Sequence, residues 1–420
     1  MLKQLTKAVI EVSKQWSSVK SYENLAQFTR PPPFNVDVLN QRGRKRLDLR
    51  GANLCQIDLN NLPLSRLCGG LDDEEWYVVT NQPNTKDLDP LERIDPTEEQ
   101  YDMAAILLEG AILREAHLEE SILTKAHLEK AILRKARLER ANLYKAHLQE
   151  ADLDGAQLKK ANLVGVLLRK ATLRRTQLQG ADLRFAQLQG AILYRTQLQG
   201  AFLISTSFDS ATALIWVILS NEKYGSVSVG DISWDGVNLT KIDWASVKTL
   251  GEEQITHKKT RRETEQRHLM YLAAVGANRQ LSVVLRDQGL DEEASRFAYR
   301  AQKLQRIIFR QQKKFGQYLF SLFLDILAGY GYRPGRSVLW YLITIIGFAL
   351  AYFTIGHLPF FPDSFVFSLT SFHGRGFFPG LGSENSLHNP LVILAAFEAV
   401  IGLLIEISFI ATFTQRFFGR

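Results

Sequence analysis

The sequence predicts a mixed fold, in which a square-coil β-solenoid is followed by a helical connector and a two-span membrane module. Three observations support this prediction. Residues repeat every five positions over 106–211, the spacing of apolar residues becomes helical over about 250–312, and two long apolar stretches lie at 338–358 and 391–413. The 420-residue chain is long enough for several domains, each with its own core.

A period of five residues is the strongest pattern in the chain. Fifteen of the twenty positions from Ala111 to Thr206 in steps of five are Ala, and the positions two residues later, from Leu113 to Leu203, are all Leu. This period matches neither an α-helix, at 3.6, nor a strand, at 2.0. It fits a square coil in which each pentapeptide forms one side and the small residue and the Leu point inward.

The repeat resembles the pentapeptide-repeat family, whose Ala-(Asp/Asn)-Leu pattern occurs here at Ala141–Leu143, Ala151–Leu153 and Ala181–Leu183. The resemblance implies a right-handed quadrilateral β-helix, in which four pentapeptides complete each turn of the solenoid.

We expect this β-helix over 47–246. It includes an outlying coil at 47–66, an acidic insertion at about 67–104 that forms a surface loop, and a weaker last coil at 227–246. The first 46 residues are expected to form a helical or linker segment.

The surface charge of the repeat excludes one function known in that family, the mimicry of DNA by an acidic protein surface. Residues 111–200 hold 16 basic against 9 acidic residues. A solvated scaffold face, open to a protein partner, fits this mixture better than nucleic-acid binding does, because outward aromatic residues are few. No P-loop, GxSxG or HExxH sequence occurs, and Cys55 and Cys68 lie in no Cys/His cluster. We therefore expect neither an enzyme nor a cofactor.

Three histidines of the repeat, His117, His127 and His147, each precede an inward Leu and so point outward. His127 and His147 should stack one coil apart. A metal site needs further converging ligands. The sequence therefore predicts solvated surface histidines and no metal.

Residues 247–314 predict a helical hairpin, with two helices joined at Gly289 and Asp291 as the N-cap of the second. The hairpin is either a stiff linker or a docking element for a protein or ligand. Residues 315–335 follow, and their apolar part, 315–328, is too short to span a bilayer. It is expected to be an interfacial helix.

Residues 336–420 are expected to form a membrane domain with two spans, at 338–358 and 391–413. Arg375 is the only Lys or Arg between the spans. The positive-inside rule therefore predicts a multi-pass protein of the cell membrane with both termini in the cytoplasm. The flanking basic residues are Lys313, Lys314, Arg333 and Arg336 before the first span, and Arg416 and Arg420 after the second.

The loop between the spans resembles the pore of two-span potassium channels. A short helix opened by Pro362 and Asp363 precedes a Gly-x-Gly turn and a Pro, and the aromatic residues around them favour a re-entrant loop. The resemblance implies a homotetramer. The pore or filter candidates are Thr370, Ser371, Phe372, His373, Gly374, Arg375, Gly376 and Phe377.

The filter departs from the channel pattern at Arg375, which stands where an aromatic residue is usual, and at Phe377, which replaces an acid. A ring of guanidinium groups repels cations. Arg375 is therefore part of an anion-selective or nonselective constriction, a structural residue paired with Glu398 or Glu406, or a mark of a pore that no longer conducts.

Glu398 and Glu406 interrupt the second span and, with Gly402 between them, recur every four residues along one stripe. Carboxylates inside a membrane are functional or paired. The sequence thus leaves two hypotheses: an ion-channel-like pore module that carries a cytosolic repeat as sensor or scaffold, and a non-conducting, membrane-anchored scaffold for protein–protein interaction.

Overall fold

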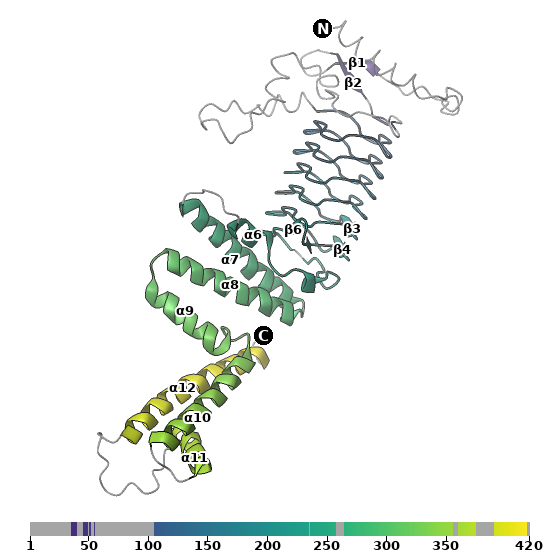
Figure 1. The fold of residues 1–420 in the computed structure, drawn as a ribbon. Helices are drawn as coiled ribbons and strands as arrows, with labels where there is room; N and C mark the ends of the chain where they lie inside the picture. Colours follow the sequence, from purple (N-terminus) through teal and green to yellow (C-terminus); the bar gives the residue numbers. More distant parts are fainter. Residues whose placement is uncertain are drawn as a thin grey trace. The chain divides into compact units, whose positions relative to one another are not determined.

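A computed structural model describes residues 35–39, 45–48, 50, 51, 54, 105–234, 236–257, 264–355, 360–374 and 390–417 of the chain. The chain divides into two compact units (Figure 1). The first is Met1–Arg261 with Val283–Leu290, and the second is Arg262–Ser282 with Asp291–Arg420.

Two short strands open the described part of the first unit. Strand β1, Asn35–Leu39, pairs antiparallel with β2, Lys45–Asp48. Strand β1 lies in the segment expected to be helix or linker, so that expectation is wrong for these five residues. Their sequence, NVDVL, alternates polar and apolar residues, which is the spacing of a strand.

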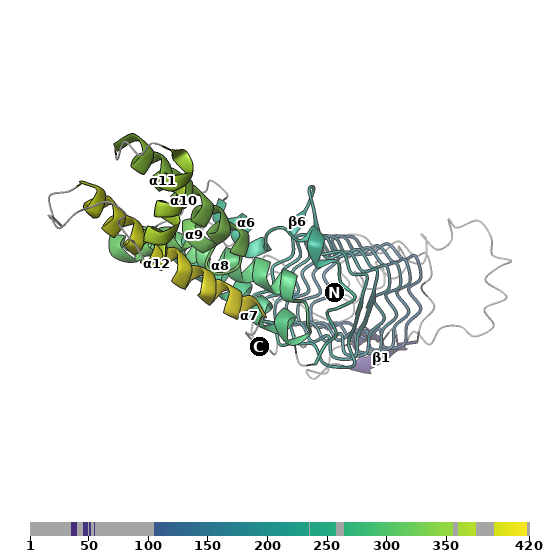
Figure 2. The ribbon, with the colours of Figure 1, turned by 90° about the horizontal axis from the view of Figure 1, so that it is seen from below.

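The repeat folds into the expected coil of twenty residues per turn. Parallel bridges join one residue of each pentapeptide, from Leu107 to Gln187, to the residue twenty positions later, as in Ile132 to Asp152, along the stack of coils (Figure 2). Every inward Leu, taken in steps of five from Leu113 to Leu203, is at most 2% exposed. The residue at each corner has a positive φ, as in Lys135 at 56°, which turns the chain by about a right angle between sides.

Polar substitutions inside the coil are satisfied by the coil itself. Thr176, Thr196 and Thr206 occupy inward small-residue positions and are fully buried. Each hydroxyl donates to a Leu carbonyl 23 residues earlier, at 2.6 to 2.9 Å. Threonine therefore replaces alanine there without leaving a buried polar group unpaired.

The last coils deviate from the twenty-residue spacing because the chain inserts residues between sides. Strand β3, Ile192–Tyr194, pairs in parallel with β4, Ala213–Ile215, one residue beyond the regular spacing. A hairpin of β5, Ser220–Asn221, and β6, Gly225–Ser226, comes next. The weaker coil expected at 227–246 follows, and its inward residues are buried: Val227, Ile232, Trp234, Val237, Leu239, Ile242 and Trp244.

Two polar side chains close the last coil. A 3-10 helix, Trp244–Ser246, leads to α6, Gly251–His257. In α6, Oε1 of Glu252 accepts hydrogen bonds from the backbone N–H groups of Val229 and Gly230, both at 2.7 Å. Gln288 accepts from Leu239 N and donates to the carbonyl of Val237. The free backbone groups of the coil end are thereby paired.

We expect the first unit to lose stability as the pH rises from about 5 to about 8. Burial raises the pKa of Glu252 to about 7, although the hydrogen bonds from backbone N–H groups oppose the shift. An acid with a higher pKa in the folded state stabilises the fold below its unfolded pKa, and this contribution is lost as the pH rises through the folded pKa. The difference from an unfolded pKa near 4.5 corresponds to at most about 3 kcal/mol.

Thermal unfolding of the wild type and of Glu252→Gln, followed by circular dichroism at pH 5 and pH 8, tests this expectation. The amide keeps the accepting oxygen and cannot titrate, so its curve should change less with pH. An equal pH dependence in both proteins would contradict the assignment.

The second unit opens with the expected hairpin. Helix α7, Thr264–Asp287, and helix α8, Asp291–Gln311, are joined through Gly289, whose φ of 75° favours glycine. Asp291 is the first residue of α8 and not its N-cap, so it lies in the first turn with Glu292 and Glu293, where acids stabilise the helix dipole. Tyr271, Ala274 and Val275 of α7 pack on Leu304 and Ile308 of α8.

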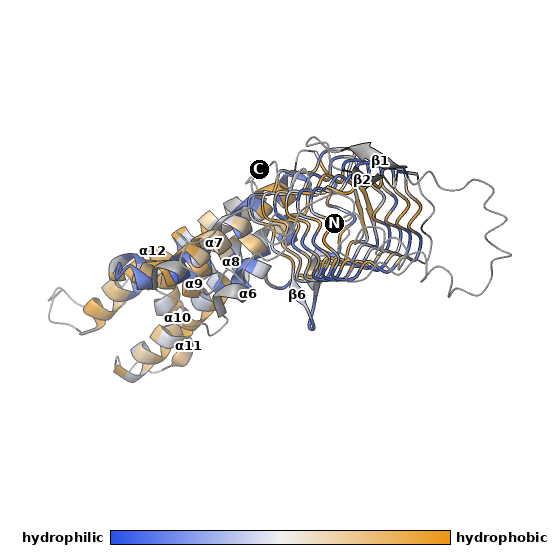
Figure 3. Ribbon diagram, turned by 90° about the horizontal axis from the view of Figure 1, so that it is seen from above, coloured by the Kyte–Doolittle hydropathy of each residue, from blue (hydrophilic) through white to orange (hydrophobic). Residues whose placement is uncertain are grey.

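Four apolar helices complete the unit, and hydrophobic residues run along them (Figure 3). Helix α9 is Phe315–Ala328, α10 is Pro334–Ile355, α11 is Phe361–Phe372 and α12 is Pro390–Phe417. Helices α10 and α12 are each long and apolar enough to cross a membrane. Helix α11 begins at Phe361, one residue before the Pro362 that was expected to open it.

Candidate functional site

Helix α11 packs against both long apolar helices, α10 and α12. Its buried residues are Ser364, Ser368, Ser371 and Phe372, which share one face through spacings of three and four. Small serine side chains let helix backbones approach closely. The short helix is therefore held along this face rather than lying free between the two long ones.

Glu398 is the centre of the contact among the three helices. Its side chain is fully buried. Tyr352 of α10 donates its hydroxyl to Oε2 at 2.7 Å, and the hydroxyl of Ser368 in α11 lies 2.5 Å from Oε1. The Ser368 oxygen also lies 2.9 Å from the carbonyl oxygen of Ile345.

The number of protons available limits which hydrogen bonds can form at once in this cluster. The Ser368 hydroxyl has one proton and therefore donates to one acceptor only. All three contacts are hydrogen bonds at once when Ser368 donates to Ile345 and a protonated Glu398 donates to Ser368. Glu398 then links α10 to α11 as a neutral carboxylic acid, which suits an apolar environment.

The stripe of α12 that follows Glu398 lies along the end of α11. A Cβ on Gly402 would be 2.3 Å from the carbonyl oxygen of Phe372, so only glycine allows this approach. One turn further, Glu406 pairs with Nδ1 of His373, whose Nε2 is 3.3 Å from the hydroxyl of Tyr341. Glu398, Gly402 and Glu406 thus contact Ser368, Phe372 and His373 in turn, along α11 and just beyond its end.

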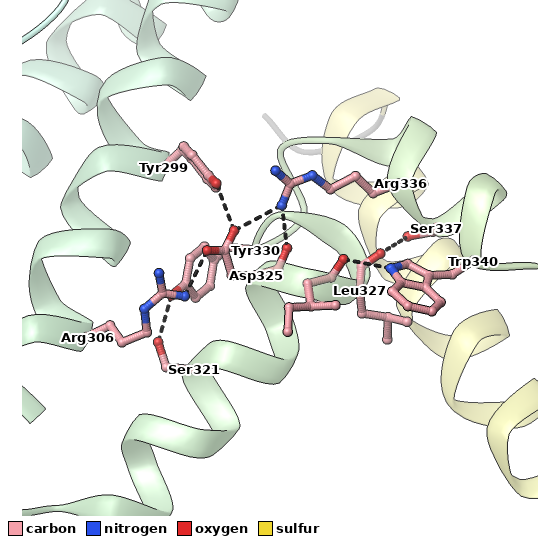
Figure 4. A network of polar contacts seen from close by, with 10 residues as sticks. Tyr299, Arg306, Ser321, Asp325, Leu327, Tyr330, Arg336, Ser337 and Trp340 are labelled. Atoms are coloured by element: carbon pink, nitrogen blue, oxygen red, sulfur yellow. Dashed lines mark hydrogen bonds and ion pairs between the residues drawn. The ribbon is translucent and has the colours of Figure 1, made fainter. Parts of the chain in front are cut away.

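The second polar centre of this unit is Asp325 of α9 (Figure 4). Its carboxylate accepts hydrogen bonds from Tyr299 at 2.7 Å and from Arg306 at 2.8 Å, both in α8. Arg336 at the start of α10 donates to the same carboxylate at 3.1 Å and to the backbone carbonyl of Asp325 at 2.7 Å. One buried residue therefore joins α8, α9 and α10.

Two further bonds fix the start of α10 to the end of α9. Ser337 donates to the carbonyl of Leu327, and the indole of Trp340 donates to that of Ile326 (Figure 4). These carbonyls lie in the last turn of α9 and have no partner within the helix. Burial alone would raise the pKa of Asp325, but the hydrogen bonds from Tyr299 and Arg306 and the nearby positive charges outweigh it and hold the pKa below its usual range.

The repeat sequence of the coil matches a known family. Residues 102–140, 136–175 and 171–209 match the family model of pentapeptide repeats, with eight copies. Residues 102–209 belong to the pentapeptide-repeat family. The family match does not extend to the helices of the second unit, and no curated protein matches the chain.

Solved structures similar to this chain are pentapeptide-repeat proteins. One is from the thylakoid lumen of Arabidopsis thaliana (25% identity, 22% of this chain and 65% of that chain, TM-score 0.22). Another is HetL, involved in heterocyst differentiation regulation in the cyanobacterium Nostoc sp. strain PCC 7120 (22% identity, 48% of this chain and 90% of that chain, TM-score 0.20). A third, also from Nostoc PCC 7120, is 33% identical over 23% of this chain and 72% of that chain, with a TM-score of 0.12.

The structure places five of the predicted pore residues of this pentapeptide-repeat protein at the end of α11. Thr370 bonds within the helix, Ser371 and Phe372 are buried, and His373 and Gly374 follow the last turn. Arg375, Gly376 and Phe377 lie outside the described residues.

The partners of the two intramembrane acids differ from the expected one. Glu398 and Glu406 were the expected partners of Arg375, whereas the described contacts of Glu398 are with Tyr352 and Ser368, and that of Glu406 is with His373. The Asp325 cluster was not predicted from the sequence. A single acid in a fourteen-residue apolar helix was the available signal for it.

Replacing Gly402 by alanine is expected to destabilise the contact between α11 and α12 by about 1–3 kcal/mol, the usual cost of overpacking. The added Cβ meets a backbone oxygen, which cannot rotate away as a side chain does. Gly347→Ala is the matched control, because Gly347 also lies within a long apolar helix and nothing is within 4 Å of its Cβ position. Unfolding in mixed micelles should separate the two variants, and equal midpoints would contradict the close approach.

Proposed function

We propose that this chain is a multi-pass membrane protein, in which α10 and α12 span the bilayer and the pentapeptide-repeat domain is a cytoplasmic scaffold. The support is the exposure of the two helices. Only 22% of the residues in each apolar window are buried, whereas a core helix of a soluble protein is mostly buried. Large hydrophobic side chains such as Leu342, Ile346 and Leu350 are about half exposed on α10, and lipid would cover them.

Helix α9 fits the expected interfacial position. Its one charged residue, Asp325, faces inward to α8, while five of its large apolar residues face outward with exposed fractions from 41% to 64%. A helix with an outward apolar face lies well at the boundary of headgroups and acyl chains. The outward residues are Phe315, Leu319, Phe320, Phe323 and Ile326.

The orientation of the proposed protein follows from its basic residues. Lys313, Lys314 and Arg333 precede the first span, and Arg375 is the only Lys or Arg in the loop between the spans. The positive-inside rule then gives cytoplasmic termini and an outer loop.

The three-helix module is proposed to be of the ion-channel pore type. The observation that supports this most is α11, a short helix anchored to both spans through the cluster of Ser368, Glu398 and Tyr352. A pore helix needs such anchoring, because the residues after it must hold a fixed geometry to contact an ion. A two-span subunit cannot enclose a pore alone, so the active form is a homo-oligomer, with four subunits implied by the resemblance to potassium channels.

A second candidate is a membrane anchor that does not conduct. The observation that favours it is that Glu398 and Glu406 both have partners within one subunit, and that Arg375 stands at the filter position. In either case the pentapeptide-repeat domain remains the proposed surface for a protein partner. Phe185 and Trp216 are exposed large residues on it.

Current through planar bilayers that hold the purified protein distinguishes the two candidates. With asymmetric KCl, the pore-type module gives current whose reversal potential identifies the permeant ion, and Arg375→Ala shifts that potential if the guanidinium selects anions. No current from wild type or variant, with insertion confirmed and several gating conditions applied, would leave the anchor as the function.

A further inference from the structure

One face of the pentapeptide-repeat domain carries three side chains that the proposed membrane function does not use. His127 and His147 are bridge partners in successive coils, and their rings lie 4.7 Å apart. The twenty-residue coil places them one above the other and points both outward. Glu129 lies two residues after His127, at the next outward position of the same coil.

Glu129 converges on both histidines. Its Oε1 is 3.3 Å from Nδ1 of His127 and 3.1 Å from Nδ1 of His147. The second oxygen, Oε2, is shielded from solvent and has no hydrogen-bond partner among the described residues. The ligand atoms of the three residues all lie within 4.8 Å of one another. Two stacked histidines alone do not make a metal site, and Glu129 is the further converging ligand that such a site needs.

We propose that His127, Glu129 and His147 bind a divalent transition-metal ion of the zinc class. Zinc–nitrogen and zinc–oxygen bonds of about 2.1 Å in a tetrahedron place ligand atoms about 3.4 Å apart. The two nitrogen–oxygen separations, 3.3 and 3.1 Å, are close to this edge. Two imidazoles and one carboxylate favour Zn²⁺ over Mg²⁺ or Ca²⁺, which prefer oxygen ligands alone.

The site has one coordination position open to solvent. The side chains of His127, His147 and Glu129 are 39%, 34% and 23% exposed, so the protein covers the ion on one side only. Three protein ligands with an open fourth position allow water or a group from a partner to complete the shell. In the coils on either side, the bridge partner of His127 is Leu107 and that of His147 is Leu167. Leucine does not bind a metal, so the site is limited to two coils.

The opposite face of the coil provides a natural comparison. His117 and Glu119 repeat the spacing of His127 and Glu129, but the bridge partner of His117 is Arg137. The Arg137 guanidinium lies 3.9 Å from Glu119. A guanidinium does not coordinate metals and neutralises the carboxylate, so this face holds two of the three groups and lacks the site.

Zinc binding by the full chain in detergent tests the proposal. The protein is purified without a polyhistidine tag, stripped with a chelator, and carries Cys55→Ser and Cys68→Ser to remove thiol ligands. Competition with a chromophoric zinc chelator should give one equivalent of bound Zn²⁺, and Co²⁺ should give the visible absorption of a tetrahedral site. His127→Ala, Glu129→Gln and His147→Arg should each lower the affinity at least about 100-fold, because the loss of an outer-shell partner alone costs about 10–100-fold.

His117→Ala is the matched control and should leave the affinity within about twofold, because it removes an equivalent histidine from the face that lacks the site. Circular dichroism should show the same coil in all variants. The proposal is overturned if the wild type binds no zinc at micromolar concentrations, or if the three site variants bind it as tightly as His117→Ala does.

Discussion

Replacing Asp325 by alanine is expected to lower the free energy of unfolding of the second unit by about 3–5 kcal/mol, the usual cost of removing one partner from a buried ion pair. The guanidinium of Arg306 is only 17% exposed and would lose its carboxylate. Tyr299 and Arg336 would lose an acceptor as well. Unfolding of the full chain in mixed micelles, followed by circular dichroism, gives the measurement.

Asp325→Asn is the control for this prediction. The amide keeps one accepting oxygen but loses the negative charge, so its effect should lie between wild type and alanine. Because the pKa of Asp325 is held below its usual range, its stabilisation is present above the unfolded pKa and is lost as the pH falls through the folded pKa. An alanine variant as stable as the wild type would show that the cluster of α8, α9 and α10 does not hold these helices together.

Replacing Glu398 by leucine should separate α11 from the two long helices. The hydroxyl of Tyr352 would remain buried without its acceptor, at a cost of about 1–3 kcal/mol, and Ser368 would lose its bond to Glu398 and keep only that to Ile345. Leucine is similar in size and cannot accept or donate. We expect an earlier unfolding midpoint in mixed micelles and faster proteolysis around α11.

Glu398→Gln distinguishes the two protonation states of the cluster. Glutamine can donate to Ser368 and accept from Tyr352, as the protonated acid does, so it should stay within about 1 kcal/mol of wild type, the scale of one hydrogen bond. A glutamine variant as unstable as the leucine variant would mean that Glu398 is charged and that Ser368 donates to it instead of to Ile345.

The coil was the most predictable part of the fold. A five-residue period excludes both an α-helix and a regular strand, and every inward Ala and Leu repeats that period. The α9 bounds and the two long apolar helices were also predicted from composition and length. Strand β1 was missed, since five residues are too few for the pattern to outweigh the surrounding polar sequence.

The polar contacts of the candidate sites could be predicted only in part. The spacing of Glu398, Gly402 and Glu406 predicted one face of a helix, but helical spacing does not say which helix lies against that face. The partners Tyr352 and Ser368 are 46 and 30 residues from Glu398 in sequence. Similarly, the repeat predicted that His127 and His147 stack, whereas the approach of Glu129 depends on side-chain rotamers.

The membrane topology of the chain tests the central claim most directly. In a Cys55→Ser and Cys68→Ser background, single cysteines are introduced as Gln312→Cys, Phe360→Cys and Arg420→Cys, and bacterial cells that express each variant are treated with a membrane-impermeant maleimide. The account predicts that only Phe360→Cys is labelled in intact cells, that the other two are labelled after permeabilisation, and that the protein stays in the membrane after an alkaline wash. Equal labelling of all three positions, or release by the wash, would contradict a two-span protein with cytoplasmic termini.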